Sequence, residues 1–334
     1  MDTPLLTVSA APHIRSIDSI PKTMWTVVAT VTPAAVFSVF NFGIPALVVI
    51  VACIVGALVS EALLQYWQKK EMTLDDGSAF LTGLLLALCL PPALPWYMAV
   101  MGSVVAITLA KHAMGGLGQN IFNPAHVGRA FLMASYPLAM TTWSVSRLWN
   151  NNMVDAVTTA TPLGILKMQG YAKLIEVFGS KHALYQTMLL GNRGGSLGET
   201  ASILLILGGL YLIKKDYIQW QVPAVMIGTV GFITWVFGGQ SGFFSGDPLF
   251  HMLAGGLILG AFFMATDMVT TPTTLQGKII FAGGAGCITA LIRLVGGYPE
   301  GVCYSILLMN ALTPMIDKYV VLKRFGVTRE RVKQ

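Results

Sequence analysis

Long apolar runs separated by short polar segments dominate this chain and restrict what it can fold into. Apolar residues make up 54% of the sequence and charged residues only 11%, whereas soluble domains carry about 25% charged residues. A membrane-spanning helix needs about 17–25 predominantly apolar residues. Ten stretches approach this length, namely 23–40, 44–64, 78–90, 94–110, 127–143, 201–213, 219–236, 249–265, 278–294 and 301–321. The sequence therefore predicts an all-α polytopic membrane protein with about ten transmembrane helices.

The distribution of basic residues predicts how these spans are oriented. If the N-terminus is cytoplasmic, that side of the membrane carries fourteen basic residues, whereas the short loops opposite carry only Arg293. Basic residues are retained on the cytoplasmic side, so both termini are expected there. Segment 144–200 then faces outward as one long loop, and long translocated loops are weakly constrained by charge. The net charge of +6 follows from this topology, and we expect no nucleic-acid partner.

A weak internal repeat divides the chain on either side of the outward loop. Lys111 precedes the pair Gly115-Gly116, and Arg293 precedes Gly296-Gly297, with the two glycine pairs 181 residues apart. An odd number of spans in each repeat inverts one half relative to the other. The predicted organisation is a cytoplasmic segment (1–22), a five-helix repeat (23–143), the outward loop (144–200), an inverted five-helix repeat (201–322) and a basic cytoplasmic tail (323–334).

The two glycine-rich segments, 115–120 and 296–301, are predicted to interrupt helices around a pocket shared by the halves, with tight turns at the membrane surface as the alternative. Polar residues near membrane depth are costly and usually functional. The candidates for lining such a pocket or binding an ion are Asn120, Asn123, Asp267, Thr270, Glu300 and Asn310. For Asp267, capping a helix competes with cation binding and is the commoner role. Cysteine and histidine spacing predicts no metal site, and no residue has the pattern of a catalytic acid, base or nucleophile.

A threonine-rich cassette lies in the outward loop and reads Asp155-Ala-Val-Thr-Thr-Ala-Thr161, followed by Pro162. Proline biases the preceding residue toward an extended backbone, so Thr161 is predicted to be extended. Ala160 leaves room around its hydroxyl. Considered alone, the cassette is typical of a loop that leads into a helix, with Asp155 as the cap.

Four sequence blocks carry a family resemblance. They are Leu-Thr-Gly-Leu-Leu-Leu-Ala-Leu-Cys-Leu-Pro-Pro at 81–92, Gly-Gly-Leu-Gly-Gln-Asn-Ile-Phe-Asn-Pro-Ala at 115–125, Phe-Met-Ala-Thr-Asp at 263–267 with Thr-Thr-Pro-Thr-Thr at 270–274, and Gly-Gly-Tyr-Pro-Glu-Gly at 296–301. In these blocks the chain resembles the D subunit of the Rnf electron-transport complex, which is similar to the B subunit of the Na⁺-translocating NADH:quinone reductase. The resemblance extends over nearly the whole chain, and the block around Gly-Gln-Asn-Ile-Phe-Asn-Pro is its most specific part.

The resemblance implies a covalent cofactor. In that family an outward-loop threonine is esterified to the phosphate of FMN, and the family pattern maps this acceptor onto Thr161. The sequence departs from the pattern at Thr159, where the family usually has glycine and a β-branched residue stiffens the backbone. By the same mapping, Thr158 and Thr159 are candidates for hydrogen bonds to the phosphate, Ala160 for the space beside it and Asp155 for positioning the hydroxyl. The phosphodiester charge is expected to be compensated by Arg147 or Arg193.

The implied function is that of a membrane flavoprotein subunit in a bacterial inner membrane. The resembling complex passes electrons between ferredoxin and NAD⁺ and couples this to Na⁺ or H⁺ movement. Its other subunits (A, B, C, E and G) are the expected partners, a flavin transferase is expected for maturation, and relatives also bind riboflavin without a covalent bond. A flavin performs the electron transfer, while the protein supplies attachment, orientation and electrostatics. The alternatives are an inverted-repeat channel or solute carrier without a redox role, and a purely structural subunit.

Overall fold

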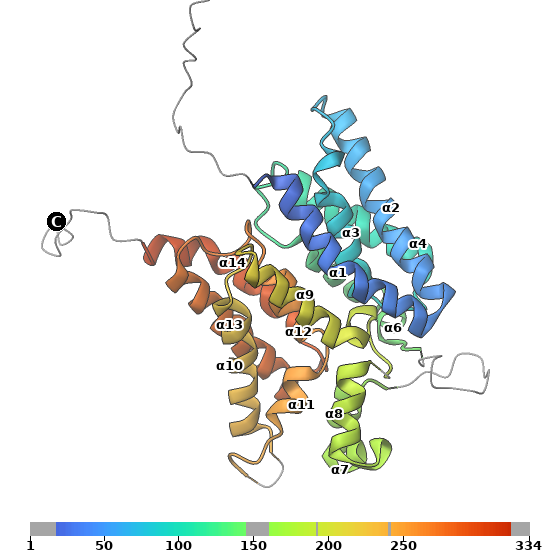
Figure 1. The fold of residues 1–334 in the computed structure, drawn as a ribbon, viewed down its shortest axis with the longest axis vertical. Coiled ribbons are helices and arrows are strands. Elements are labelled where there is room, and N and C mark those ends of the chain that lie inside the picture. Colours follow the sequence, from blue (N-terminus) through green and yellow to red (C-terminus); the bar gives the residue numbers. More distant parts are fainter. Residues whose placement is uncertain (1–17, 145–159, 192, 240–241, 322–334) are drawn as a thin grey trace, which may run out of the picture.

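The structure, a computed structural model, describes residues 18–144, 160–191, 193–239 and 242–321. Every regular element in these ranges is a helix (Figure 1). The first half comprises α1 (Ile20–Phe42), α2 (Ile44–Trp67), η1 (Leu74–Asp76), α3 (Ser78–Leu88), α4 (Trp96–Val105), η2 (Ala106–His112), α5 (Pro124–Ser135) and α6 (Pro137–Thr141). The segment between the halves, named the outer segment after its predicted side of the membrane, comprises α7 (Pro162–Phe178), α8 (Lys181–Leu190) and η4 (Leu197–Ala201). The second half comprises α9 (Ser202–Lys214), α10 (Gln221–Phe237), α11 (Pro248–Leu253), α12 (Leu257–Leu259), η5 (Gly260–Met264), α13 (Leu275–Leu294) and α14 (Val302–Tyr319).

Three of these helices, α1, α2 and α13, are long and apolar enough to cross a membrane. In α2 the exposed apolar residues recur every fourth position, at Leu47, Val51, Val55, Val59 and Leu63. This spacing places them on one helical face, and an exposed apolar face of that length fits contact with lipid. The chain is therefore a multi-pass membrane protein, as its composition predicted.

Local sequence signals fix where many helices begin. Four helices combine a capping side chain with a proline in the first turn, and their caps are Ser19 for α1, Asn123 for α5, Thr161 for α7 and Asp247 for α11. A cap oxygen accepts one of the free N–H groups of the first turn. Proline is tolerated there because its missing N–H has no partner in the helix anyway. These caps place several polar side chains at the ends of the spans, where the cavities described below lie.

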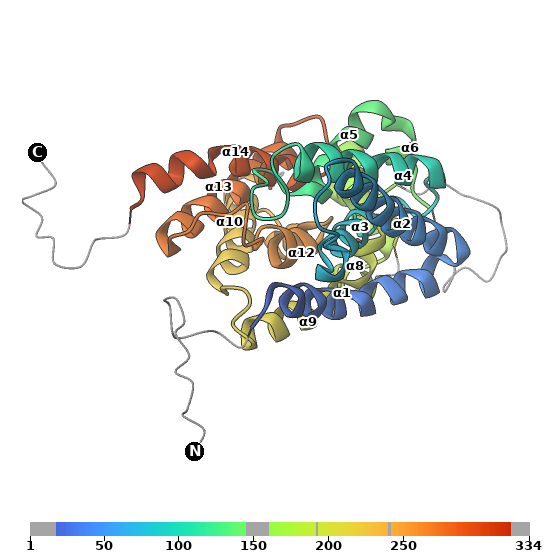
Figure 2. The same cartoon turned by 90° about the horizontal axis from the view of Figure 1, so that it is seen from above.

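The two halves form neighbouring helical groups that meet along two helix pairs. In both views α1 runs beside α9, while the helices of the second half group around α10, α13 and α14 (Figures 1 and 2). The other meeting point is between α5 and α14. Contacts there pair Asn123 with Asn310, the region of His126 with Cys303, and Arg129 with Glu300. Because the numbers rise on one helix as they fall on the other, α5 and α14 are antiparallel.

Two predicted spans are not continuous helices. Span 249–265 is broken between α11 and α12, where Gly255 adopts φ of +65°, a conformation that favours glycine. Span 127–143 is divided at Tyr136, where the backbone leaves the helical region before Pro137. The apolar composition of the two stretches predicted neither break.

The outer segment differs from the single long loop that the sequence predicted. Residues 162–190 form the helices α7 and α8, which lie at the lower end of the molecule beside α11 (Figure 1). Leu174, Leu184 and Met188 of these helices are fully buried and pack against Phe250 of α11. Leu163 and Ile165 belong to the same cluster. The cluster therefore attaches the outer segment to the second half and holds the start of α7 directly.

Candidate functional site

The predicted polar residues occupy two separate cavities instead of one shared pocket. Asn120, Asn123 and Asp267 line an inner cavity of about 100 Å³, whereas Glu300 lines an outer cavity together with Thr161. The two glycine-rich segments separate in the same way, since Asn120 ends the first and Glu300 lies in the second. The prediction of a single pocket between the halves was wrong, because it took equivalent positions in the two halves to be neighbours in space.

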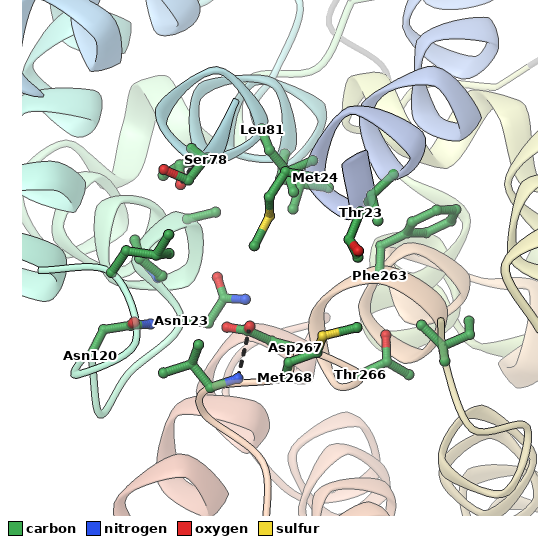
Figure 3. A pocket seen from close by; sticks show the side chains of 18 of the residues that line it. Thr23, Met24, Ser78, Leu81, Asn120, Asn123, Phe263, Thr266, Asp267 and Met268 are labelled. Carbon is green, nitrogen blue, oxygen red and sulfur yellow. Dashed lines mark hydrogen bonds between the residues drawn. The ribbon is translucent and has the colours of Figure 1, made fainter. Parts of the chain in front are cut away.

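The inner cavity lies between the two halves, and Asn120, Asn123 and Asp267 point into it (Figure 3). Asp267 is already engaged by its own turn, since Oδ1 accepts from the Val269 N–H at 3.3 Å and Oδ2 from the Thr270 hydroxyl at 3.2 Å. These bonds close a local turn. They do not make Asp267 the helix cap that the sequence suggested, because α13 begins only at Leu275 and is capped by Thr274. The Thr270 hydroxyl orients the Asp267 carboxylate at the cavity wall.

Asn310 does not line the inner cavity but contacts Asn123, which does. With its amide oriented to satisfy both polar atoms, its oxygen accepts from the Asn123 backbone N–H at 3.0 Å and its nitrogen donates to the Ile306 carbonyl at 3.2 Å. Asn310 is fully buried. It therefore fixes the start of α5, from which the Asn123 side chain enters the cavity, and it does so from the other half of the molecule.

A buried ion pair borders the same cavity. The Lys111 ammonium lies 2.6 and 2.7 Å from the two carboxylate oxygens of Glu61 and 2.6 Å from the Ser78 hydroxyl. Lys111 and Ser78 both line the cavity. Three partners use the three N–H donors of the lysine. The inner cavity is thus walled by a neutralised, fully hydrogen-bonded pair and not by a free charge.

The outer cavity, of about 520 Å³, contains the threonine singled out by the cassette. Its lining includes the cassette residues Ala160 and Thr161, the aromatic residues Trp143, Tyr298 and Tyr304, and the polar or sulfur-bearing residues Arg129, Met168, Glu300 and Cys303. A volume of this size lies within the range of about 300–1,000 Å³ that small-molecule sites occupy. An apolar, aromatic wall with a few polar groups suits a planar ring system.

Thr161 serves as the N-cap of α7. Its backbone is extended, with φ of −64° and ψ of 154°, which confirms the conformation predicted from Pro162. Its Oγ1 accepts from the Gly164 N–H at 3.1 Å, so Thr161 takes the capping role that the sequence reading gave to Asp155. An ester on this oxygen leaves a lone pair for the Gly164 N–H, and a phosphate bound there lies at the positive end of the helix.

Arg129 faces the same cavity and was missed by the sequence reading. Its guanidinium forms an ion pair with Glu300, and both side chains are largely buried, with 6% and 14% of their surface exposed. The second Glu300 oxygen accepts from the Gly256 N–H at 2.6 Å. A lone arginine inside predicted span 127–143 was the signal that could have found it, because ionised side chains within spans are costly and rarely lack a role.

Two further buried arginines satisfy the break between α11 and α12. Arg293 donates to the carbonyls of His251 and Ala254, the latter at 2.8 Å, and Arg193 donates to the Leu253 carbonyl at 3.2 Å. Arg193 is thus directed at the broken helix and does not appear among the residues that line the outer cavity. Its predicted role opposite a phosphate at Thr161 was therefore wrong.

Four of the residues predicted around the flavin lie outside the part of the chain that the structure describes. They are Arg147, Asp155, Thr158 and Thr159. Their proposed roles remain predictions from the family pattern.

A side cavity of about 800 Å³ lies on another face of α7, lined by Lys167, Tyr171, Lys181, Tyr185 and Asp247 among others. Both tyrosine hydroxyls donate to Asp247 Oδ2 at 2.6 Å, and the Phe250 N–H donates to Oδ1 at 3.1 Å. Burial acts to raise the pKa of Asp247, but these hydrogen bonds outweigh it and hold the pKa below its usual value. Asp247 is thus a charged anchor for α7 and α8.

These features together define a helical, multi-pass membrane protein with a ligand-sized cavity at the capped start of α7. The chain belongs to the NQR2, RnfD, RnfE family, whose model matches residues 7–326. It is 64% identical to the D subunit of the proton-translocating ferredoxin:NAD(+) oxidoreductase complex of Clostridium ljungdahlii, with 97% of each chain covered. It is 42% identical to the Na(+)-translocating counterpart of Acetobacterium woodii, over 97% of this chain and 96% of the relative. It is 37% identical to the D subunit of the ion-translocating oxidoreductase complex of Halorhodospira halophila, over 96% and 95%.

Proposed function

We propose that this protein is the D subunit of an ion-translocating ferredoxin:NAD⁺ oxidoreductase complex. The observation that carries the proposal is the 64% identity, across 97% of both chains, to a protein of that name. The two relatives named above for a particular ion differ, one translocating protons and the other Na⁺. The proposal therefore extends to ion translocation by the complex and not to one ion. The other subunits of such a complex would carry the sites that react with ferredoxin and NAD⁺.

Within this function, we propose that the chain carries FMN as a phosphoester on Thr161. The outer cavity supports this by its volume, its aromatic wall and the presence of Thr161, the N-cap of α7, in its lining. Thr161 would hold the phosphate, and Tyr298, Tyr304 and Met168 would enclose the ring. When bound, the flavin supplies the capacity to accept and pass on electrons, which no side chain here offers. Attachment requires a flavin transferase acting on the outer side.

Riboflavin, the second expected cofactor, stays a prediction to which we assign no residues. The inner cavity, at about 100 Å³, is smaller than the sites that usually enclose molecules of that size. Most of its lining is apolar, with Asn120, Asn123 and Asp267 among the few polar groups.

We also propose that the two halves are inverted five-helix repeats in the bacterial inner membrane, with both termini cytoplasmic. Corresponding helices pack alike, since α2 contacts α4 as α10 contacts α13, and α4 contacts α5 as α13 contacts α14. In two pairs of counterparts the helices contact each other across the halves, α1 with α9 and α5 with α14. Because the counterparts α5 and α14 are antiparallel, this pattern fits a two-fold axis in the membrane plane. It also accounts for the separation of equivalent glycine-rich segments into two cavities.

Flavin attachment is tested in the intact complex, produced together with a flavin transferase. We expect the protein to fluoresce in a denaturing gel and its flavin-bearing peptide to contain modified Thr161, whereas Thr161→Ala abolishes the signal. Thr158→Ala and Thr159→Ala serve as matched controls because they remove neighbouring hydroxyls. An unmodified Thr161 in wild type, with another known acceptor labelled in the same cells, contradicts the flavin proposal and favours the channel or carrier.

A further inference from the structure

The ion pair between Arg129 and Glu300 crosses from one half of the molecule to the other at the wall of the outer cavity. Arg129 belongs to α5 and Glu300 precedes α14, and both line the cavity that contains Thr161. Both side chains are largely buried. A pair in this position is held by the meeting of the two halves and faces whatever occupies the cavity.

Glu300 is oriented by a second hydrogen bond besides the ion pair. Glu300 accepts from the Gly256 N–H at 2.6 Å through the oxygen that Arg129 does not use. Of the three buried arginines described above, Arg129 alone has a carboxylate within ion-pair distance in the described part of the chain, since Arg193 and Arg293 donate to backbone carbonyls. The cavity wall therefore presents one fixed positive and one fixed negative charge side by side.

Fixed charges in a buried wall act strongly on a ligand whose charge changes. Interaction energies rise as the surrounding dielectric falls, and preorganised charges need no reorganisation when the ligand charge appears. A flavin that takes up two electrons and one proton gains one negative charge. In the proposed complex those electrons derive from reduced ferredoxin. A nearby cation stabilises this added charge and a nearby carboxylate opposes it.

We propose that Arg129 and Glu300 set the reduction potential of the flavin on Thr161, with Arg129 raising it and Glu300 lowering it. The inference rests on the proposed function, because it concerns the flavin that Thr161 would carry. Arg129 is the cavity-facing electrostatic group, and Glu300 is a positioning residue that fixes the guanidinium and moderates its field. The pair gives the protein two opposing controls over one potential.

The sign of each substitution separates this role from a structural one. Arg129→Gln removes the positive charge and is expected to lower the midpoint potential, whereas Glu300→Gln removes the negative charge and is expected to raise it. Glutamine keeps an oxygen that can accept from the Gly256 N–H, so Glu300→Gln changes charge with little change in shape. Arg129→Lys keeps the charge and is expected to stay near the wild-type potential. If the pair acted only through packing, both substitutions would shift the midpoint potential in the same direction.

The experiment uses the whole complex, with covalent flavin on this chain first quantified by fluorescence in a denaturing gel. Potentiometric titration then follows the flavin absorbance, and the Thr161→Ala complex is subtracted to remove signals from other subunits. We expect each charge-removing variant to change the equilibrium constant for reduction at least tenfold, which is about 30 mV for two electrons. Arg193→Gln is the matched control, because it removes a buried arginine that is directed at the broken helix, and we expect a smaller shift.

The outcomes distinguish the inference from the proposed function. Unchanged potentials, or shifts in the same direction for Arg129→Gln and Glu300→Gln, with flavin present on Thr161, overturn the inference and leave the function intact. Absence of flavin from wild-type Thr161 overturns the flavin proposal itself. If Arg129→Gln does not accumulate, the upward shift of the milder Glu300→Gln variant, compared with Arg129→Lys, still decides the matter.

Discussion

At the scale of single residues, Thr161 combines two roles that substitutions can separate. Its oxygen caps α7, and the same oxygen is the proposed site of the flavin ester. In protein made without a flavin transferase, we expect Thr161→Ala to lower the free energy of unfolding by about 0.5–2 kcal/mol, the usual cost of losing a cap. Thr161→Asn keeps a capping oxygen and is expected to remain close to wild type. Thermal unfolding of the purified chain in detergent measures this difference.

When the transferase is present, substitutions of Thr161 are expected to differ in flavin attachment as well as in stability. Thr161→Ser should retain both the cap and the flavin, whereas Thr161→Asn should retain the cap alone. Attachment of flavin to the asparagine variant is the result that would contradict the assignment of the hydroxyl as acceptor.

At the scale of helices, the α7–α8 pair depends on the charge of Asp247. Its pKa is lowered in the folded protein, so the stability that it contributes is present above the unfolded pKa of about 3.9 and is lost as the pH falls through the lower folded value. We expect pepsin to cleave within 162–190 with increasing speed below about pH 4, because protonation weakens the hydrogen bonds from Tyr171 and Tyr185. The Asp247→Asn protein should be cleaved by pepsin at a rate that depends much less on pH. An identical profile in both proteins would exclude this anchor.

Another prediction concerns the close packing of α13 on α10. A Cβ at Gly286 would lie 2.7 Å from the Met226 carbonyl oxygen, whereas one at Gly283 meets only Val225 Cγ1 at 3.8 Å. Gly286→Ala is therefore expected to lower stability by about 1–3 kcal/mol, as overpacked sites do. Gly283→Ala, on the same helix, should be neutral or slightly stabilising, because alanine favours helix. Unfolding in detergent compares them, and equal effects would mean that the two helices separate easily.

At the scale of the whole molecule, the inverted arrangement predicts opposite labelling of the two surfaces. Met72, after α2, should face the cytoplasm, and Phe243, between α10 and α11, should face outward; both are more than half exposed. In cells expressing Cys287→Ala protein, a membrane-impermeant maleimide should label Phe243→Cys at once and Met72→Cys only after permeabilisation. The three remaining cysteines are buried. Labelling of both positions in intact cells would refute the proposed topology.

Apolar composition was enough to predict a helical membrane protein, because lipid contact needs long apolar helices whatever their partners. Local rules were also enough for the extended backbone of Thr161, since Pro162 is its neighbour. The break at 253–256 was beyond such rules. Its freed carbonyls are satisfied by Arg193 and Arg293, residues that lie far away in the sequence. The pairing of Arg129 with Glu300 was unpredictable for the same reason, because the two residues are 171 positions apart.

The antiparallel contact of α5 with α14 joins the two cavities through one short helix. Asn123 at the start of α5 lines the inner cavity and Arg129 lines the outer one, and six residues of helix span only about 9 Å. A shift of α5 against α14 therefore moves both walls together. A ligand or charge in the outer cavity that favours one position of α5 therefore changes the affinity of the inner cavity for its own ligand. By thermodynamic linkage, a ligand in the inner cavity changes the affinity of the outer cavity by the same factor.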